Sequence, residues 1–330
     1  MFKREYKINV YGKILEEGFK KLSDFADISF YPVNKLPGIE EFECQNNDAD
    51  AIVTWFTHKL DAIYISKLKK TRVIANYAVG YDNIDIKAAS SAGIIVLNTP
   101  DILTNATAET ALLLTFACAK RMKESILRVM TQNLEDVSPS FMLGKDISGK
   151  TVGVIGAGRI GSKYAQMMHS LGCNILYHNR NHSQLLDDSG FRYTKLYDLL
   201  LESDIVSLHV PLTSETKNLL DCEKLSMMKD DAILINTSRA SVIDEEALIS
   251  LLNKGKFFSI GLDVYNNEPY PDPRLLDFNR VILLPHIGSA TYETRLKMAE
   301  FLSETILLAL EGKITSLNNI VNKDLLESII

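Results

Sequence analysis

The stretch Thr151-Val-Gly-Val-Ile-Gly156-Ala-Gly158-Arg-Ile-Gly161 decides the fold of this chain. A short strand-like run leads directly into the spacing Gly-x-Gly-x-x-Gly, and a helical pattern follows at once. The first glycine permits a tight turn, the second lets the backbone approach a pyrophosphate, and the third lets helix pack close to strand. The free N–H groups of the helix then point at phosphates. The stretch predicts a dinucleotide site, with an ordinary glycine-rich turn as the alternative.

The composition indicates a globular protein with room for two domains. The chain has 330 residues, of which 46% are hydrophobic and 24% charged, and domains usually hold 100–200 residues. The net charge is −6 and no basic block occurs, which argues against a nucleic-acid partner. The most apolar run, residues 111–119, is too short to cross a bilayer, so no membrane partner is expected.

The N-terminal residues and the cysteines favour a cytoplasmic location. Lys3 and Arg4 are not followed by the apolar segment of a signal peptide. The four cysteines are far apart and lack metal-ligand spacing, which favours free thiols and predicts no metal site.

Strand-like and helix-like segments alternate along the whole chain, which predicts parallel sheets covered by helices on both faces. In the first third we expect strands at residues 7–10, 28–31, 49–53, 72–76 and 94–98, and helices at residues 13–22, 61–69 and 85–92. Asn83 or Asp85 would cap the last of these helices. A long helix over residues 106–130 would then connect two lobes.

A second series begins at the glycine loop and has six expected strands, as in a Rossmann fold. The strands are expected at residues 151–155, 174–178, 205–209, 232–236, 258–263 and 281–284, and the helices at residues 159–171, 195–201, 223–228 and 245–254. Gly172 and Gly255 would end two helices. A final helix at residues 292–310 would return to the first lobe.

The expected fold is therefore α/β with two doubly wound domains. A Rossmann cofactor domain, residues 102–289, is inserted into a flavodoxin-like substrate-binding domain formed by residues 1–101 and 290–330.

Three residues that could do chemistry follow consecutive predicted strands: Arg239, Glu268 and His286. The carboxyl ends of parallel strands meet at one edge of a sheet, where ligands of open α/β sheets bind. A guanidinium, a carboxylate and an imidazole can together bind an acidic substrate and deliver a proton. Taken singly, each residue more often has a surface or structural role, and the functional interpretation depends on all three lying at one edge of one sheet.

The chain resembles the D-isomer-specific 2-hydroxyacid dehydrogenases, most closely their glyoxylate/hydroxypyruvate reductase branch. The resemblance covers nearly the whole length. It rests on motifs in the family's order: residues 79–85 (Val-Gly-Tyr-Asp-Asn-Ile-Asp), 98–100 (Asn-Thr-Pro), 106–109 (Ala-Thr-Ala-Glu), 149–156, 209–213 (His-Val-Pro-Leu-Thr), 236–239 (Asn-Thr-Ser-Arg), 261–264 (Gly-Leu-Asp-Val), 268–269 (Glu-Pro) and 285–290 (Pro-His-Ile-Gly-Ser-Ala).

The resemblance implies an NAD(P)H-dependent reductase that converts a small 2-oxo acid, such as glyoxylate or hydroxypyruvate, to the D-2-hydroxy acid. Arg239 would bind the substrate carboxylate and polarise the oxo group, and His286 would be the general acid and base. Glu268 would hold His286 and stabilise its imidazolium form. The lobes would close over the substrate.

The resemblance also implies two sets of binding residues. Asp263 would contact the nicotinamide carboxamide, and Thr107 would lie near the phosphates. The expected cofactor-binding residues are Gly156, Gly158, Arg159, Ile160, Gly161, Asn179, Arg180, Thr107, His209, Pro211, Thr237 and Asp263, and the expected substrate-binding residues are Val79, Gly80, Trp55 and Leu103. The N–H groups of Val79 and Gly80 would bind the carboxylate.

Two positions bear on the choice of cofactor. Family members that prefer NAD have an aspartate after the second Rossmann strand, which accepts hydrogen bonds from the ribose. Here that position is Asn179, followed by Arg180, which can pair with a 2′-phosphate. We therefore expect NADP(H) rather than NAD(H), with a merely solvated Arg180 and NAD binding as the alternative.

Substrate size is predicted from Trp55 and Phe56, whose bulk disfavours a phosphorylated substrate. The alternative is that Trp55 only packs the hinge.

Two departures from the family occur: Ala240 replaces a usual glycine, and residues 133–143 lack the branch's tryptophans. In the family that segment often reaches the active site of a neighbouring subunit. The resemblance therefore implies a homodimer formed through the cofactor domain. Two further alternatives are a dinucleotide-sensing, corepressor-like protein and a formate or phosphite dehydrogenase.

Overall fold

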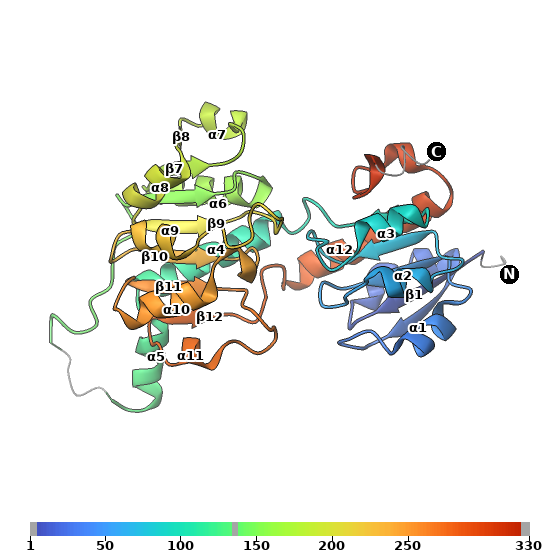
Figure 1. Cartoon of the computed structure of the whole chain (residues 1–330), viewed down its shortest axis with the longest axis horizontal. Coiled ribbons are helices and arrows are strands. Elements are labelled where there is room, and N and C mark those ends of the chain that lie inside the picture. Colours follow the sequence, from blue (N-terminus) through green and yellow to red (C-terminus); the bar gives the residue numbers. More distant parts are fainter. Residues whose placement is uncertain (1–4, 134–137, 325–330) are drawn as a thin grey trace. The chain divides into compact units, whose positions relative to one another are not determined.

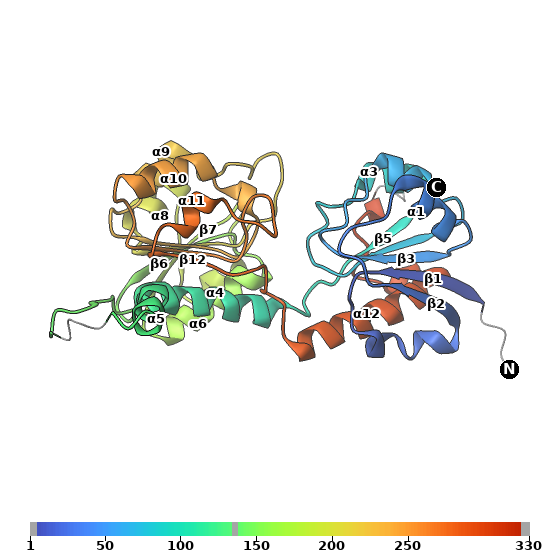
Figure 2. The ribbon, with the colours of Figure 1, turned by 90° about the horizontal axis from the view of Figure 1, so that it is seen from below.

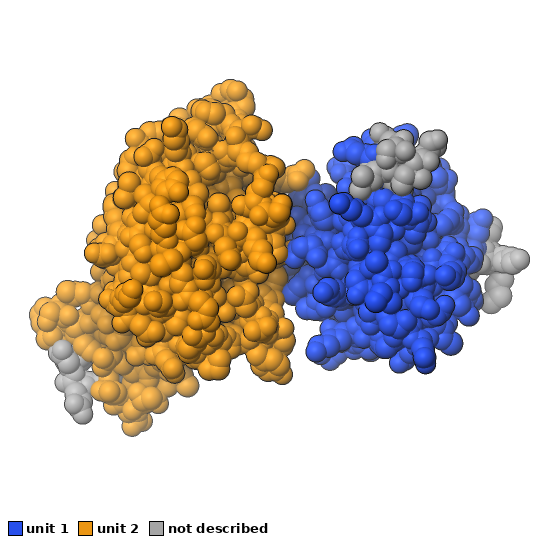
Figure 3. All heavy atoms as spheres, in the orientation of Figure 1, with its two compact units in different colours: residues 1–103, 289–330 blue, residues 104–288 orange. Residues whose placement is uncertain are grey.

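The computed structural model describes residues 5–133 and 138–324. These residues form two compact units, coloured separately in Figure 3. Unit 1 comprises residues 1–103 and 289–330, and unit 2 comprises residues 104–288. Each unit has its own parallel sheet (Figure 1), so the predicted α/β class is confirmed.

Unit 1 contains a five-stranded sheet with the order β2-β1-β3-β4-β5, which is the flavodoxin-like order. Its strands are β1 (Tyr6–Tyr11), β2 (Ala26–Tyr31), β3 (Ala51–Thr54), β4 (Val73–Asn76) and β5 (Ile95–Leu97). All residues of β3 and β4 are buried, as expected for parallel strands covered on both faces.

Helices cover both faces of this sheet, with α12 on the face opposite α1 and α3 (Figure 2). They are α1 (Ile39–Asn46), α2 (Ala62–Ser66), α3 (Ile86–Ser91) and α12 (Tyr292–Leu310), with short 3-10 helices at Glu16–Phe19, Leu22–Asp24 and Ile314–Ser316. Asp85 is the residue that caps α3, since its side chain accepts a hydrogen bond from the Ala88 N–H.

The predicted helix at residues 13–22 is wrong. The segment forms two 3-10 turns, η1 (Glu16–Phe19) and η2 (Leu22–Asp24), and η1 packs on α12. A Cβ atom on Gly18 would lie 2.3 Å from the Ala299 Cβ, so this glycine permits a close approach that has no local signal.

Unit 2 contains a seven-stranded parallel sheet with the order β12-β11-β10-β9-β6-β7-β8. Its strands are β6 (Thr151–Ile155), β7 (Asn174–His178), β8 (Arg192–Tyr193), β9 (Ile205–Leu208), β10 (Ile233–Asn236), β11 (Ser259–Leu262) and β12 (Val281–Leu283). Six were expected, and the seventh is the two-residue β8. The order reverses between β7 and β9 around the central β6, as in a Rossmann sheet.

The helices of unit 2 lie on both faces, with α4 and α6 opposite α8, α9 and α10 (Figure 2). They are α4 (Thr104–Ala119), α5 (Met122–Met130), α6 (Arg159–Ser170), α7 (Gln184–Asp188), α8 (Leu196–Glu202), α9 (Cys222–Met227), α10 (Glu245–Asn253) and α11 (Pro273–Leu276), with a 3-10 turn at Ala240–Val242. Gly172 and Gly255 follow α6 and α10 with φ of 85° and 84°, which confirms both predicted helix ends.

The predicted single helix over residues 106–130 is wrong, because it breaks at Arg121. Arg121 has φ 53° and separates α4 from α5. The chain returns here, and the Lys145 N–H donates 2.8 Å to the Ala119 carbonyl. The Ala119 carbonyl at the end of α4 is thus bonded to a residue far along the chain, and α4 ends there.

No helix among the described residues is long and apolar enough to cross a membrane, and the four cysteines are free.

Candidate active site

The glycine loop joins β6 to α6, and its three glycines have different reasons to be glycine. Gly156 has φ +99°, and an added Cβ would lie 2.6 Å from the His209 carbonyl oxygen. A Cβ on Gly161 would lie 1.9 Å from the Gly156 oxygen. A Cβ on Gly158, however, would meet no atom within 4 Å. Gly158 therefore faces the open space into which a pyrophosphate would fit, at the N-terminus of the twelve-residue α6.

The three predicted catalytic residues follow adjacent strands of unit 2. Arg239 follows β10, Glu268 follows β11 and His286 follows β12, and these strands pair in parallel. His286 Nδ1 lies 2.8 Å from a Glu268 carboxylate oxygen, and both side chains are about one-fifth exposed, at 23% and 22%. Arg239 is half-buried, and its guanidinium donates to the Ser238 carbonyl. The sheet thus brings a paired imidazole and a guanidinium to one edge.

Asp263 holds the turn that carries His286. Its carboxylate accepts a hydrogen bond of 2.7 Å from the Ile287 N–H and another of 2.7 Å from the Gly288 N–H. His286 itself has φ 55°, a left-handed conformation that only surrounding structure can maintain. Burial raises the pKa of Asp263, and the two N–H donors oppose that shift.

Other predicted cofactor residues line the same edge of unit 2. The buried Thr237 hydroxyl has no hydrogen-bond partner among the described residues, so it is available to a ligand. The Thr107 hydroxyl donates 3.0 Å to the Gly288 carbonyl. His209 lies beside Gly156, and burial lowers its pKa to about 3, so it is neutral at pH 7. The Pro211 carbonyl accepts from the Thr216 hydroxyl.

Asn179 and Arg180 lie at the end of β7, on the other side of the glycine loop. Arg180 is 85% exposed, and its guanidinium lies 3.8 Å from the Glu215 carboxylate. The turn that carries Glu215 is fixed by its own threonines, because the Glu215 N–H donates to the Thr213 hydroxyl. Of the remaining loop residues, Arg159 is exposed, whereas Ile160 packs against the core of unit 2.

The predicted substrate residues belong to unit 1. Trp55 follows β3, and Val79 and Gly80 follow the neighbouring β4. The Val79 carbonyl accepts from the Asn98 amide, and the Gly80 carbonyl accepts from the Asn76 amide. Leu103 is buried, with 7% of its surface exposed.

The two departures from the family have different outcomes. Ala240 begins a 3-10 turn without the left-handed backbone that would require glycine. Residues 134–137 of the segment without tryptophans lie outside the described residues.

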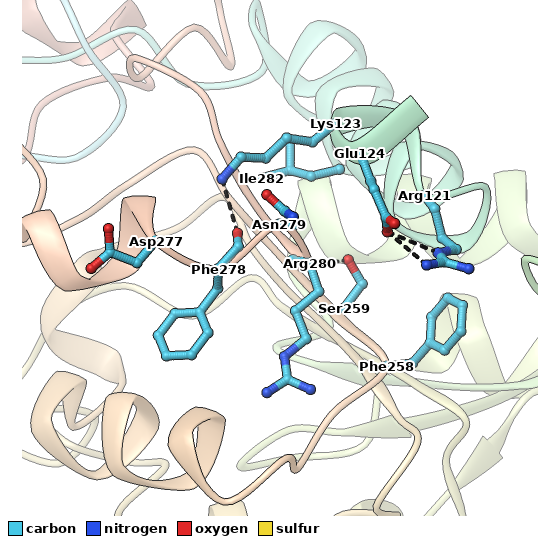
Figure 4. Close-up of a pocket in the computed structure, with 10 residues that line it drawn as sticks. All are labelled: Arg121, Lys123, Glu124, Phe258, Ser259, Asp277, Phe278, Asn279, Arg280 and Ile282. Atoms are coloured by element: carbon cyan, nitrogen blue, oxygen red, sulfur yellow. Dashed lines mark hydrogen bonds and ion pairs between the residues drawn. The ribbon is translucent and has the colours of Figure 1, made fainter. Parts of the chain in front are cut away.

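A separate cavity of about 390 Å³ lies at the opposite edge of the unit 2 sheet (Figure 4). It borders the amino ends of β11 and β12 and is lined by Arg121, Lys123, Glu124, Phe258, Ser259, Asp277, Phe278, Asn279, Arg280 and Ile282. Lys123 donates to two backbone carbonyls and Arg121 pairs with Glu124. These cations already have partners within the protein, and none of the predicted site residues lies here.

The fold and the strand-end residues of unit 2 define a dinucleotide-dependent oxidoreductase. Residues 112–288 match the family "D-isomer specific 2-hydroxyacid dehydrogenase, NAD binding domain". The chain belongs to this family and is an oxidoreductase that uses a nicotinamide dinucleotide. It is 40% identical over 327 residues to a glyoxylate reductase of Thermococcus litoralis, covering 98% of both chains.

Solved structures agree with this assignment. The TT0316 protein of Thermus thermophilus superposes with a TM-score of 0.89 and 35% identity, over 96% of this chain and 99% of the other. A D-lactate dehydrogenase of Aquifex aeolicus complexed with NAD and lactic acid gives 0.85 and 28%, over 95% and 99%. An acyclic imino acid reductase complexed with NADPH and D-Arg gives 0.85 and 28%, over 96% and 99%.

Several residues at these edges were not predicted from the sequence. Glu215 contacts Arg180, Asn76 and Asn83 hold the Gly80 loop, and Arg295 lies over Trp55. Strand-end position could have indicated Asn76, which is the last residue of β4. Asn83 belongs to the motif of residues 79–85, although its contact with Asn76 was not predicted. The contacts of Glu215 and Arg295 are tertiary and have no sequence signal.

Proposed function

We propose that this enzyme reduces a small 2-oxo acid, such as glyoxylate or hydroxypyruvate, to the D-2-hydroxy acid. The observation that carries the proposal is the His286–Glu268 pair at 2.8 Å, placed on the same sheet edge as Arg239. An imidazole whose second nitrogen is held by a carboxylate is built to pass a proton. The names of the relatives support the same reaction.

In the proposed mechanism Arg239 binds the substrate carboxylate and draws electron density from the 2-oxo group. When bound, the reduced nicotinamide supplies a hydride to C2. His286 donates a proton to the carbonyl oxygen, so that hydride and proton together convert the 2-oxo group to an alcohol. Glu268 holds the imidazole and balances its charge while it is protonated. In the reverse direction His286 takes the proton from the hydroxyl.

We assign the dinucleotide to unit 2 and the substrate-binding residues Val79, Gly80, Trp55 and Leu103 to unit 1. The residues of unit 2 suit a pyrophosphate, since Gly158 faces open space and the Thr237 hydroxyl is buried without a partner among the described residues. The Asp263 oxygens that hold the His286 turn keep lone pairs for the nicotinamide carboxamide. Trp55 favours a small substrate over a phosphorylated one.

We propose NADP(H) as the preferred cofactor. Asn179 brings no negative charge to the ribose, and Arg180 can form a charge-assisted pair with a 2′-phosphate. Relatives have been solved with NAD and with NADPH, so membership of the family does not fix the cofactor. The charges beside the 2′ position of the ribose decide between NAD(H) and NADP(H). The nearby Glu215 carboxylate opposes a 2′-phosphate and limits the preference.

We also propose a homodimer through unit 2. Helix α5 has no buried residue, and five of its apolar side chains are exposed: Met122, Ile126, Leu127, Val129 and Met130. An exposed apolar face of this kind is typical of a protein interface.

The cytoplasmic location expected from the sequence stays a prediction.

The test is a panel of glyoxylate, hydroxypyruvate and pyruvate, each assayed with NADH and with NADPH. We expect reduction of at least one acid, with the higher kcat/KM for NADPH. His286→Ala should lower kcat about 100-fold to 10,000-fold and leave cofactor affinity unchanged. His169→Ala, on the exposed end of α6, is the matched control. Full turnover by His286→Ala, or cofactor binding without reduction of any acid, contradicts the proposal, and the second result favours a dinucleotide-sensing protein.

A further inference from the structure

Trp55 is the single tryptophan of the chain, and it stands at a strand end inside an aromatic group of unit 1. Its ring centroid lies 5.6 Å from that of Tyr77 and 4.3 Å from that of Phe56. Trp55 and Tyr77 follow β3 and β4, which pair in parallel with Thr54 opposite Asn76. The indole therefore stands beside the chain that leads to Val79 and Gly80.

Arg295, on the first turns of α12, covers this indole. Its guanidinium carbon lies 4.3 Å from the Trp55 ring centroid and 6.0 Å from that of Tyr77. Its Nε donates 3.0 Å to the Ser289 carbonyl, and the Tyr77 hydroxyl donates to the Arg295 carbonyl. Both the side chain and the backbone of Arg295 are thus fixed, so the cation stays over the ring.

A second set of contacts fixes the backbone beneath the indole. The Asn83 amide donates 3.2 Å to the Trp55 carbonyl and also contacts Asn76. The Asn76 amide donates 2.7 Å to the Gly80 carbonyl, and its oxygen accepts from the Thr54 hydroxyl. Asn76 is fully buried. The backbone of Trp55 and that of Gly80 therefore form one hydrogen-bonded assembly, and only the indole torsions remain to be fixed.

We propose that Arg295 is a positioning residue that sets the size limit for the substrate by holding the Trp55 indole in one orientation. This inference rests on the proposed function, because it takes Trp55 and Gly80 as substrate-binding residues. The cation–π contact selects one rotamer of a half-buried ring. Without it the indole samples other staggered rotamers, which enlarges the space beside Gly80 and weakens contacts to the smallest acids.

The first test reads the indole directly. Since the chain has one tryptophan, its fluorescence reports on this residue alone. Arg295→Gln should red-shift the emission and raise the acrylamide quenching constant about two-fold, whereas Arg295→Lys, which keeps a cation, should restore part of the difference. The control is Arg72→Gln, which removes a guanidinium placed 5.6 Å from the Tyr6 ring in the same unit and should leave the spectrum unchanged.

The second test measures selectivity. With NADPH saturating, Arg295→Gln should raise KM for glyoxylate about ten-fold and lower or preserve KM for a branched acid such as 2-oxoisovalerate. The kcat for glyoxylate and the affinity for NADPH should stay within about two-fold, and Arg295→Lys should recover most of the selectivity. A merely structural residue would change both substrates equally.

The outcomes separate this inference from the proposed function. An unchanged tryptophan spectrum in Arg295→Gln, or equal changes for both acids, overturns the inference while leaving the reductase proposal intact. If the wild-type protein reduces no 2-oxo acid, the proposed function fails and the size limit fails with it. If Arg295→Gln does not fold, the spectrum and selectivity of Arg295→Lys decide, because loss of the guanidinium plane should still produce a smaller shift in the same direction.

Discussion

Replacing Asp263 by Asn tests whether this carboxylate fastens the turn that carries His286. The carboxylate is 1% exposed and accepts two backbone hydrogen bonds of 2.7 Å. An amide of the same shape offers one acceptor and one donor group, so one of the two N–H groups, that of Ile287 or Gly288, would face another donor.

The expected loss of stability follows from these contacts. Hydrogen bonds to a charged group contribute about 1.5–3 kcal/mol each, and asparagine recovers one neutral bond of about 1 kcal/mol. Removing a buried charge offsets part of the loss, in line with the raised pKa of Asp263. The net destabilisation should be about 2 kcal/mol, which for a unit of this size lowers Tm by roughly 4–8 °C.

The assay is thermal and urea unfolding of the cofactor-free protein, which removes any contribution of Asp263 to ligand binding. Asp231→Asn is the control, because Asp231 is 72% exposed and its ion pair with Lys145 should contribute no more than about 1 kcal/mol. Faster amide exchange at Ile287 and Gly288 should accompany the loss. A stability within about 0.5 kcal/mol of wild type, with unchanged exchange, would refute the reasoning.

Three further predictions concern unit 2. The pKa of His209 in the folded protein, about 3, lies below the usual 6.5, so the unfolded chain takes up a proton at a higher pH than the folded protein does. Between pH 7.5 and 5 the free energy of unfolding of wild type should therefore fall by about 1–2 kcal/mol relative to that of His209→Gln. Parallel pH profiles of the two proteins in urea unfolding would contradict this. Glu215→Gln should lower KM for NADPH about three-fold and leave KM for NADH unchanged, with Glu202→Gln as control; an equal change for both cofactors would show that Glu215 does not face the 2′-phosphate. Val129→Glu should convert a dimer to a monomer in light scattering, because it places a charge on the exposed face of α5, whereas Leu201→Glu on α8 should not; a wild-type monomer would dismiss the dimer.

The sequence predicts the parts of the fold whose signal is local. Fully buried parallel strands such as β3, β4 and β10 each begin with three consecutive apolar residues, and Gly172 and Gly255 mark helix ends by their own backbone conformation. By contrast α1 was missed, because only Phe42 and Asn46 are buried along it and no apolar period results. The break at Arg121 depends on a distant segment, Gly144 and Lys145, that returns to Ala119.

The same distinction applies to the site. Strand-end position was enough to group Arg239, Glu268 and His286, since parallel strands bring their carboxyl ends together. The roles of Asp263 as a fastener and of Arg295 as a cover for Trp55 depend on contacts across 24 residues and between segments far apart in sequence. No periodicity or motif encodes such contacts, because they arise only when the sheet has formed.

The three loop glycines are under different constraints, since some are required by the fold and one only by the cofactor. Two of them, Gly156 and Gly161, are demanded by the protein's own atoms, whereas Gly158 meets none within 4 Å. A descendant that abandoned its dinucleotide would still be obliged to keep the first and third glycines in order to fold. Among divergent descendants, a substitution of the middle glycine, Gly158, is therefore the earliest sequence change that would indicate loss of cofactor binding.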